Sequence, residues 1–264
     1  MPSITEITVS QLSGLIGLPH SPPIIDVRDD EEFAADPRLI PGSQRRDFST
    51  VASWGPDYKD QSVIVACQEG LQLSQGVGAW MRAQGIDAQT IEGGFQAWRK
   101  ERQLLVRAEK LPLRDDADRT VWVTRARPKV VRIACPWLIR RFVDPKAVFL
   151  FVAPSEVTTV ADRFKATPFD AVDTFWGDRG DKCTFDVMIE EFGLDSDALT
   201  RLALVVRGAD TGRQDLSPHS AGLLATSLGY SRMYRDDLAQ LEAAMGFYDA
   251  FYRWCRDAVN ETHA

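Results

Sequence analysis

The chain has 264 residues, of which 44% are hydrophobic and 26% charged, and its formal net charge is −7 at pH 7. No stretch approaches the roughly 18 consecutive apolar residues of a membrane-spanning helix. The acidic balance, shared by both halves of the chain, argues against a nucleic-acid partner. Residues 1–18 carry no Lys or Arg and so lack the basic flank of a secretion signal. We therefore expect a cytoplasmic protein of about two domains, without membrane or nucleic-acid partners.

The first hundred residues alternate short β-rich runs with helical stretches. Three runs of apolar or β-branched residues predict strands: residues 23–28, 61–67 and 87–91. Residues 73–84 have helical spacing, which places Val77, Trp80 and Met81 on one stripe. Strands that alternate with helices predict an α/β fold over residues 1–106, with a mostly parallel sheet and flanking helices.

The pattern fades between residues 107 and 119, where charged residues and Pro112 interrupt any apolar periodicity. We interpret residues 107–119 as a linker and residues 120–264 as a second, mainly α-helical α+β domain. Its predicted strands are residues 120–123 and 147–152, and its predicted helices are residues 131–142, 184–192, 197–206, 217–228 and 236–259. In the last helix, Phe247, Phe251 and Trp254 follow the i, i+4, i+7 spacing of a core stripe.

The cysteines lie far apart in the sequence and form no CxxC pair. In a cytosolic chain, such cysteines are free thiols rather than a disulfide framework. We therefore predict four reduced cysteines: Cys67, Cys135, Cys183 and Cys255.

Cys67 ends a predicted strand, and a short loop joins it to a predicted helix. Backbone N–H groups of such a loop, with the positive end of the helix dipole, stabilise a thiolate, a persulfide anion or a bound oxyanion. Gly70 permits the sharp bend that this loop needs. A cysteine at a strand end also serves simply as a small apolar core residue, and the loop alone leaves both interpretations open.

Four segments, in order along the chain, resemble the signatures of the rhodanese family: residues 24–33, 39–43, 67–72 and 91–98. The resemblance implies that Cys67 is the catalytic nucleophile, which takes a sulfane sulfur atom as a persulfide and passes it to a thiol acceptor. The resemblance further implies that this domain requires no cofactor. It also implies an active-site loop that comprises Gln68, Glu69, Gly70, Leu71 and Gln72.

Two departures from the rhodanese pattern bear on the sulfur donor. Gln72 stands where thiosulfate-using members commonly carry a basic residue, and Glu69 adds a negative charge. A dianionic donor should be repelled, so we predict weak thiosulfate turnover and favour a persulfide or protein donor. Asp26 and Arg28, at the end of the first predicted strand, are interpreted as supporting residues, equally open to a structural and a catalytic role.

Arginines recur in the second half, beside acidic residues and cysteines. Guanidinium groups suit tetrahedral oxyanions because their planar forks offer paired donors. The candidates for oxyanion binding are Arg132, Arg140, Arg141, Arg179 and Arg207. The alternative interpretation is that these arginines form salt bridges with neighbouring aspartates such as Asp144 and Asp181.

Residues 132–142 resemble the opening motif of the chromate-resistance domain, which forms the C-terminal half of ChrB-type proteins. Residues 180–186, 207–210 and 221–224 are similar to its later motifs. The resemblance implies a role in the response to chromate, as an oxyanion sensor or in detoxification. ChrB-type regulators carry a different N-terminal half, taken to bind DNA, and a rhodanese-like domain stands in that place here.

A metal site in the second domain is a further alternative. Many relatives carry histidines where this chain has Asp178 and Arg207, and this chain has only His20, His219 and His263. A histidine-rich metal site is therefore excluded. A metal or thiol site built from carboxylates and cysteines would use Cys135, Asp178, Cys183 and Asp210.

These expectations combine into one leading hypothesis and two alternatives. The leading hypothesis is a sulfurtransferase that acts in chromate, oxyanion or sulfur stress, with a small-molecule or protein sulfur donor and a thiol acceptor. One alternative is a non-catalytic sensor or binding protein for chromate or sulfate. The other is a metal-dependent enzyme in the second domain.

Overall fold

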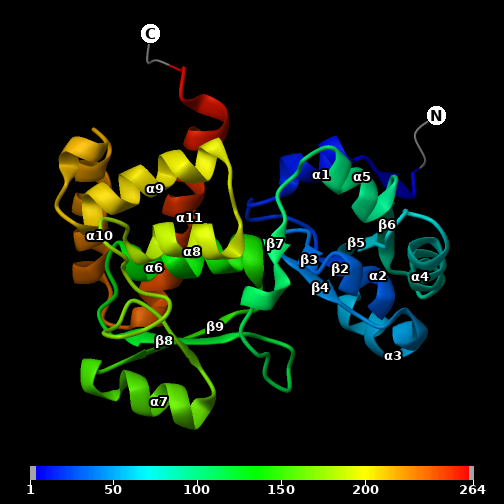
Figure 1. Ribbon diagram of the computed structural model, residues 1–264, viewed down its shortest axis with the longest axis horizontal. Coiled ribbons are helices and arrows are strands. Elements are labelled where there is room, and N and C mark those ends of the chain that lie inside the picture. Colours follow the sequence, from blue (N-terminus) through cyan, green and yellow to red (C-terminus); the bar gives the residue numbers. More distant parts are fainter. Residues whose placement is uncertain (1–3, 262–264) are drawn as a thin grey trace. The chain divides into compact units, whose positions relative to one another are not determined.

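The computed structural model describes residues 4–261, which leaves His263 outside the described part of the chain. By their contacts the residues form two compact units. The first comprises residues up to 109 together with 141–144, and the second comprises residues 110–140 and 145 onward. Figure 1 labels the helices and strands of both units. None of the described helices is long and apolar enough to cross a membrane.

A five-stranded parallel sheet organises the first unit and confirms the predicted α/β fold. Its strands run in the order β1-β6-β5-β2-β4, and a separate antiparallel pair joins β3 to β7. The strands are β1 Glu6–Ile7, β2 Ile24–Asp26, β3 Arg38–Leu39, β4 Ser43–Arg45, β5 Ser62–Ala66, β6 Asp87–Ile91 and β7 Val106–Arg107. The helices are α1 Val9–Leu15, α2 Asp30–Ala35, α3 Val51–Trp54, α4 Gln72–Ala83 and α5 Gly94–Lys100.

Helix α4 packs on the sheet beside β5 and β6. Its Val77 and Met81 are buried, as the apolar spacing predicts. Trp80 is 50% exposed, so its predicted place on the same buried stripe is wrong. The helix approaches the sheet through Gly78, where an added Cβ would lie 3.4 Å from a methyl carbon of Thr90. This close approach leaves Trp80 at the margin of the buried face.

The second unit combines a small sheet with a larger set of helices, which confirms a mainly helical second domain. Its strands are β8 Val121–Arg125, β9 Val148–Val152 and β10 Thr167–Pro168, all parallel and in the order β10-β8-β9. Its helices are α6 Val131–Leu138, α7 Val157–Phe164, α8 Thr184–Phe192, α9 Asp197–Asp210, α10 Ser220–Met233 and α11 Asp237–Arg253.

Helices cover both faces of this sheet (Figure 1). On one face, Val123 of β8 and Val157 and Ala161 of α7 form a buried cluster. On the other face, Trp122 of β8 meets Phe169 and Phe192 edge to face. The central strand β8 is therefore buried between two layers of side chains, as parallel strands usually are.

The ends of four helices in this unit differ from the predicted ranges. Helix α9 runs four residues past its predicted end, to Asp210. Helices α6 and α11 pass into π-helical turns over residues 139–143 and 254–258. Helix α10 begins only at Ser220, because the Ser217 hydroxyl accepts a hydrogen bond from His219 N at 3.3 Å and forms a separate turn before the helix.

The predicted core stripe of the last helix is also wrong. The buried residues of α11 include Leu241, Tyr248 and Tyr252, whereas Phe247, Phe251 and Trp254 of the predicted stripe are only partly buried. Both sets follow helical spacing, and they lie on neighbouring rows of the same helix. The row that faces α6 and α9 forms the core.

Candidate functional site

Cys67 lies at the carboxyl end of β5, directly before the loop that leads to α4. Its side chain is buried, with 4% of the residue exposed, and its Sγ lies 3.1 Å from Ser74 Oγ. Ser74 is the third residue of α4, so the turn of the helix brings its hydroxyl back toward the strand end. The same hydroxyl donates a hydrogen bond to Leu71 O at 3.3 Å. A hydroxyl group that can both donate and accept therefore touches the sulfur atom.

The loop after Cys67 is held against the turn that begins α5. Phe95 N donates to Cys67 O and Gln96 N donates to Gln68 O, both at 2.9 Å. Gly70 has φ of +74°, and a Cβ on it would lie 2.5 Å from Ile91 O and under 3 Å from the turn's backbone nitrogens. The loop can therefore take this shape only with glycine at that position.

The backbone N–H groups of the loop remain available for an anion. Within residues 4–261, no group accepts a hydrogen bond from N–H of residues 68–71. The loop also leads directly into the positive end of α4. Gln68 is partly buried and its Oε1 has no partner among the described residues, whereas Glu69, Leu71 and Gln72 are exposed.

Asp26 and Arg28 form a buried ion pair at the carboxyl end of β2, the strand beside β5. Their closest atoms lie 2.6 Å apart, and the Arg28 side chain is fully buried. Arg28 also donates to Asp36 O and Arg38 O, and its guanidinium group lies 3.7 Å from the centre of the Phe95 ring. Because Phe95 holds the Cys67 carbonyl, this pair supports the loop from behind.

A hollow of about 380 Å³ opens at the carboxyl ends of β2 and β4, and Arg28 is the one lining residue that the sequence analysis named as a site residue. Arg28, Arg45 and Arg46 line it together with acidic residues. Arg45 pairs with Asp30 at 2.9 Å and stacks on Phe33. In the sequence, the adjacent Arg45 and Arg46, just after the second rhodanese-like signature, could have indicated this hollow.

In the second unit, a buried carboxylate holds two arginines. Asp170 follows β10 and lies 2.8 Å from Arg125 and 3.2 Å from Arg132. Burial raises the pKa of Asp170, although both guanidinium groups oppose the shift. Burial lowers the pKa of Arg132, against the attraction of Asp170. Asp170 and Arg125 were missed in the sequence, where an acidic residue after a short apolar run was the only signal.

Asp178 and Cys183 organise the beginning of α8. Asp178 accepts hydrogen bonds from Thr184 N at 2.8 Å and from Thr184 Oγ1 at 2.9 Å. Cys183 Sγ donates to Asp186 Oδ2 at 3.1 Å. Burial, and next the Asp186 carboxylate, raise the pKa of the Cys183 thiol far above its usual range. The thiol therefore stays protonated, and it serves as a helix-capping group.

Cys135 and Asp210 lie near the same carboxylates. Cys135 is completely buried in α6, and burial raises the pKa of its thiol well above the ordinary value. Desolvation of the carboxyl group, and next the charge of Asp170, raise the pKa of Asp210 to about 6, although the residue keeps a solvent-exposed edge. Within residues 4–261, no group of three or more His, Cys, Asp or Glu side chains is arranged to hold a metal ion.

The five candidate arginines do not meet at one point. Arg132 contacts Asp170, Arg140 pairs with Glu242 of α11, and Arg179 pairs with Glu191 of α8. The Arg207 guanidinium lies 3.7 Å from both Asp181 and Asp186, the longest of these separations. Arg141 is partly buried and lies in the segment that joins the first unit.

Two family profiles match the chain, one for each unit. The family described as ChrB, C-terminal domain matches residues 122–255, and the rhodanese-like domain matches residues 8–101. Over 132 residues the chain is 34% identical to protein ChrB of Cupriavidus metallidurans. The aligned region covers 50% of this chain and 39% of that protein. The chain thus spans about two fifths of the length of this curated relative.

Solved structures of rhodanese-like proteins resemble part of the chain. A rhodanese-like domain protein from Staphylococcus aureus is 32% identical, with a TM-score of 0.32, over 36% of this chain and 90% of that one. A rhodanese-related protein from Thermoplasma volcanium is 24% identical, with a TM-score of 0.34, over 38% of this chain and 96% of that one. Both family matches agree with the resemblances in the sequence. The chain therefore belongs to the ChrB C-terminal domain family and carries a rhodanese-like domain ahead of that domain.

Proposed function

We propose that this protein is a sulfurtransferase that carries sulfur as a persulfide on Cys67 and acts in chromate, oxyanion or sulfur stress. The observation that carries the proposal is the surroundings of Cys67 Sγ. The Ser74 hydroxyl lies 3.1 Å away, and the neighbouring loop offers N–H groups that no described residue occupies. Such donors stabilise an anionic sulfur atom more than a neutral one.

The transfer proceeds in two displacements. The Cys67 thiolate attacks the outer sulfur of a donor persulfide, so that a Cys67 S–S bond forms and the donor leaves as a thiolate. An acceptor thiolate then attacks the terminal sulfur, which regenerates the Cys67 thiolate and forms the acceptor persulfide. The outer sulfur moves without net oxidation or reduction, so these steps need no cofactor. Ser74 and the loop N–H groups stabilise the sulfur anion at each stage.

The charges around the loop favour a persulfide donor over thiosulfate. Glu69 and Gln72 are both exposed beside Cys67, so an approaching dianion meets a carboxylate and no guanidinium from the loop. Arg45 supplies positive charge from β4, but Asp30 already neutralises it at 2.9 Å. A monoanionic donor, small or protein-bound, experiences less repulsion.

The second domain would connect this chemistry to oxyanions. Its family membership, together with chromate's likeness to sulfate in shape and charge, supports a role in chromate response. Among Arg132, Arg140, Arg179 and Arg207, the last lies farthest from its carboxylates, which makes it the best of these four to bind an incoming oxyanion. Burial keeps both motif thiols protonated, so a metal bound through them would have to displace their protons.

A non-catalytic binding role for the first domain is the second candidate function. The 4% exposure of Cys67 favours it, because a buried thiol meets donors slowly. In this case, the loop would bind an anion through its N–H groups without forming a covalent bond.

One experiment separates these functions: intact-mass analysis of the protein after exposure to glutathione persulfide or thiosulfate, with and without chromate. We expect wild type to gain one sulfur atom from the persulfide, much less from thiosulfate, and Cys67→Ser to gain none. Cys255→Ser, which removes another buried thiol, is the matched control and should load normally. Loading that persists in Cys67→Ser would refute the proposal, and no loading from either donor would leave the binding role.

A further inference from the structure

The outer edge of β9 is a free edge of the sheet in the second unit. Among the described strands, β9 pairs with β8 alone. Val148 N donates to Thr120 O at 2.9 Å, so Val148 uses its backbone groups toward β8. Alternate residues of a parallel strand bond to the same neighbour. The backbone N–H and C=O groups of Phe149 and Phe151 therefore point to the free edge.

The two edges of this sheet differ in their protection. The β10 edge is only two residues long and ends in Pro168, and both features prevent further pairing. The β9 edge has five residues, all apolar, without proline or charge. An edge of this kind pairs readily with another strand.

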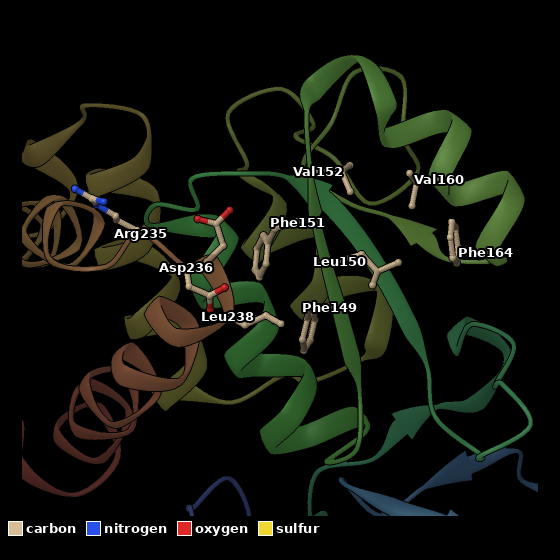
Figure 2. Close-up of a pocket in the computed structure, with 10 residues that line it drawn as sticks. Phe149, Leu150, Phe151, Val152, Val160, Phe164, Arg235, Asp236 and Leu238 are labelled. Atoms are coloured by element: carbon tan, nitrogen blue, oxygen red, sulfur yellow. The ribbon is translucent and has the colours of Figure 1, made fainter.

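A groove of about 580 Å³, which we call the β9 groove, follows this free edge (Figure 2). Its apolar lining comes from both faces of the strand and from two helices, and it includes Phe149, Leu150, Phe151, Val152, Phe164 and Leu238. Because successive side chains of a strand point to opposite faces, a lining from both faces means that the groove runs along the edge itself. At its walls, Phe164 of α7 is 64% exposed and Leu238 of α11 is 47% exposed.

The sequence of β9 is symmetric. Val-Phe-Leu-Phe-Val reads the same in both directions, centred on Leu150. In an antiparallel pair with a second copy around a two-fold axis at Leu150, Phe149 of one copy lies opposite Phe151 of the other. These are the residues whose backbone groups point outward, so each such pair exchanges two hydrogen bonds. The strand matches itself in side chains and in hydrogen bonds at the same register.

The charges at the rim are self-complementary as well. Arg235, Asp236 and Asp237 lie side by side where α11 begins, beside the apolar lining. A two-fold axis brings one copy's rim toward the other's, so that the guanidinium group of each copy can meet a carboxylate of its partner. A single peptide of one charge sign would satisfy only part of this rim.

We propose that the β9 groove binds β9 of a second copy of this chain. The antiparallel pairing of the two β9 strands then joins the two small sheets into one continuous sheet. The exposed Phe164 and Leu238 side chains become buried beside the partner's strand. Because this pairing uses neither Cys67 nor its loop, it holds whether or not the protein transfers sulfur.

A disulfide at the symmetry axis tests the register directly. Leu150 of one copy lies opposite Leu150 of the other as a non-hydrogen-bonded pair. The Cα atoms of such a pair lie about 4.5 Å apart, within the range of a disulfide. We expect Leu150→Cys to form a covalent dimer on mild oxidation, seen on a non-reducing gel. The native thiols are all buried, so they do not compete with the new one.

Val152→Cys is the matched control on the same face of the same strand. Across the proposed axis, the two Val152 Cα atoms are roughly 14 Å apart, too far for a disulfide. We expect it to stay monomeric on the same gel. Equal cross-linking of both variants, or none in either, would overturn the proposed pairing.

The mass of the unmodified protein gives an independent test. Sedimentation of the wild type over a concentration series should show a dimer, and Phe151→Lys should shift it to monomer, with its fold checked by circular dichroism. A dimer that survives Phe151→Lys would place the interface elsewhere and refute the proposal. A monomeric wild type would also refute it, even if the groove bound an extended peptide instead.

Discussion

At the scale of single residues, Ser74 distinguishes the Cys67 site from an ordinary buried thiol. Its hydroxyl lies 3.1 Å from Cys67 Sγ, and Leu71 O offers it a second partner at 3.3 Å. While the sulfur is protonated, the hydroxyl can accept from it and donate to the carbonyl. Once the sulfur is an anion, the same hydroxyl can turn and donate to it. The site therefore adapts to both charge states without moving the backbone.

We expect Ser74→Ala to slow persulfide formation on Cys67 by at least about tenfold, because a hydrogen bond to a charged group contributes about 1.5–3 kcal/mol. Single-turnover loading from glutathione persulfide measures the effect. Ser43→Ala is the control: Ser43 is also a buried serine of the same unit, and its hydroxyl has no hydrogen-bond partner among the described residues. Equal rates in both variants would remove Ser74 from the mechanism.

At the scale of elements, Asp210 connects two helices. It is the last residue of α9, where the helix dipole disfavours negative charge, and it accepts a hydrogen bond from Val131 N at the beginning of α6. Its pKa of about 6 lies above the value near 3.9 expected in the unfolded chain. The folded state therefore favours the protonated form, and stability falls as the pH rises from about 4 through 6.

We expect Asp210→Asn to stabilise the protein above pH 6, since the amide keeps an acceptor for Val131 N without the charge. The gain should vanish below pH 4, where wild-type Asp210 is protonated in both states. Urea midpoints at pH 4 and pH 7.5 measure it. Asp215→Asn should show no gain, because Arg213 lowers the pKa of Asp215. A midpoint for Asp210→Asn that follows wild type at both pH values would contradict this.

Elements with clear apolar periodicity could be predicted from the sequence. The range of α8, Thr184–Phe192, matches its prediction, and β5 and β6 differ from theirs by at most one residue. Helix α7 was missed, because Thr158 and Thr159 are β-branched and weaken the helical signal. Its apolar residues nevertheless follow i, i+3, i+4, i+7 spacing.

The site residues that could be predicted depend on local sequence patterns, and those that were missed depend on contacts between distant segments. Cys67 was found because its loop has a local pattern of strand, glycine and helix. Asp170 was missed because its partner Arg125 lies 45 positions away, and only the folded sheet brings them together. Trp80 and Phe247 were misassigned because several rows of one helix fit the same period, and the packing partner decides which row is buried.

At the scale of the whole molecule, the chain joins two acidic units through residues that the second unit partly holds. Lys110 pairs with Glu191 at 2.8 Å, and a turn closed by Arg114 and Thr120 follows within the predicted linker. Between them, Leu113 is 86% exposed. The covalent connection raises the effective concentration of one domain at the other.

We expect limited chymotrypsin digestion of the native chain to cut first after Leu113, because exposed loop residues are cleaved before packed elements. Mass spectrometry of the two fragments identifies the site. Leu113→Asp removes the preferred side chain and should delay the cut severalfold. First cleavage within a helix or strand of either unit would contradict this.

The burial of all four thiols limits the rate at which they can react. A bulky alkylating reagent can reach a sulfur atom only when the surrounding elements open, so the labelling rate of each cysteine reports how often its neighbourhood opens. The Cys67 loop, bounded by two backbone hydrogen bonds to the α5 turn, needs a smaller opening than the core around Cys135. In the proposed sulfur transfer, the frequency of that opening would set an upper limit on how fast Cys67 gains or loses sulfur.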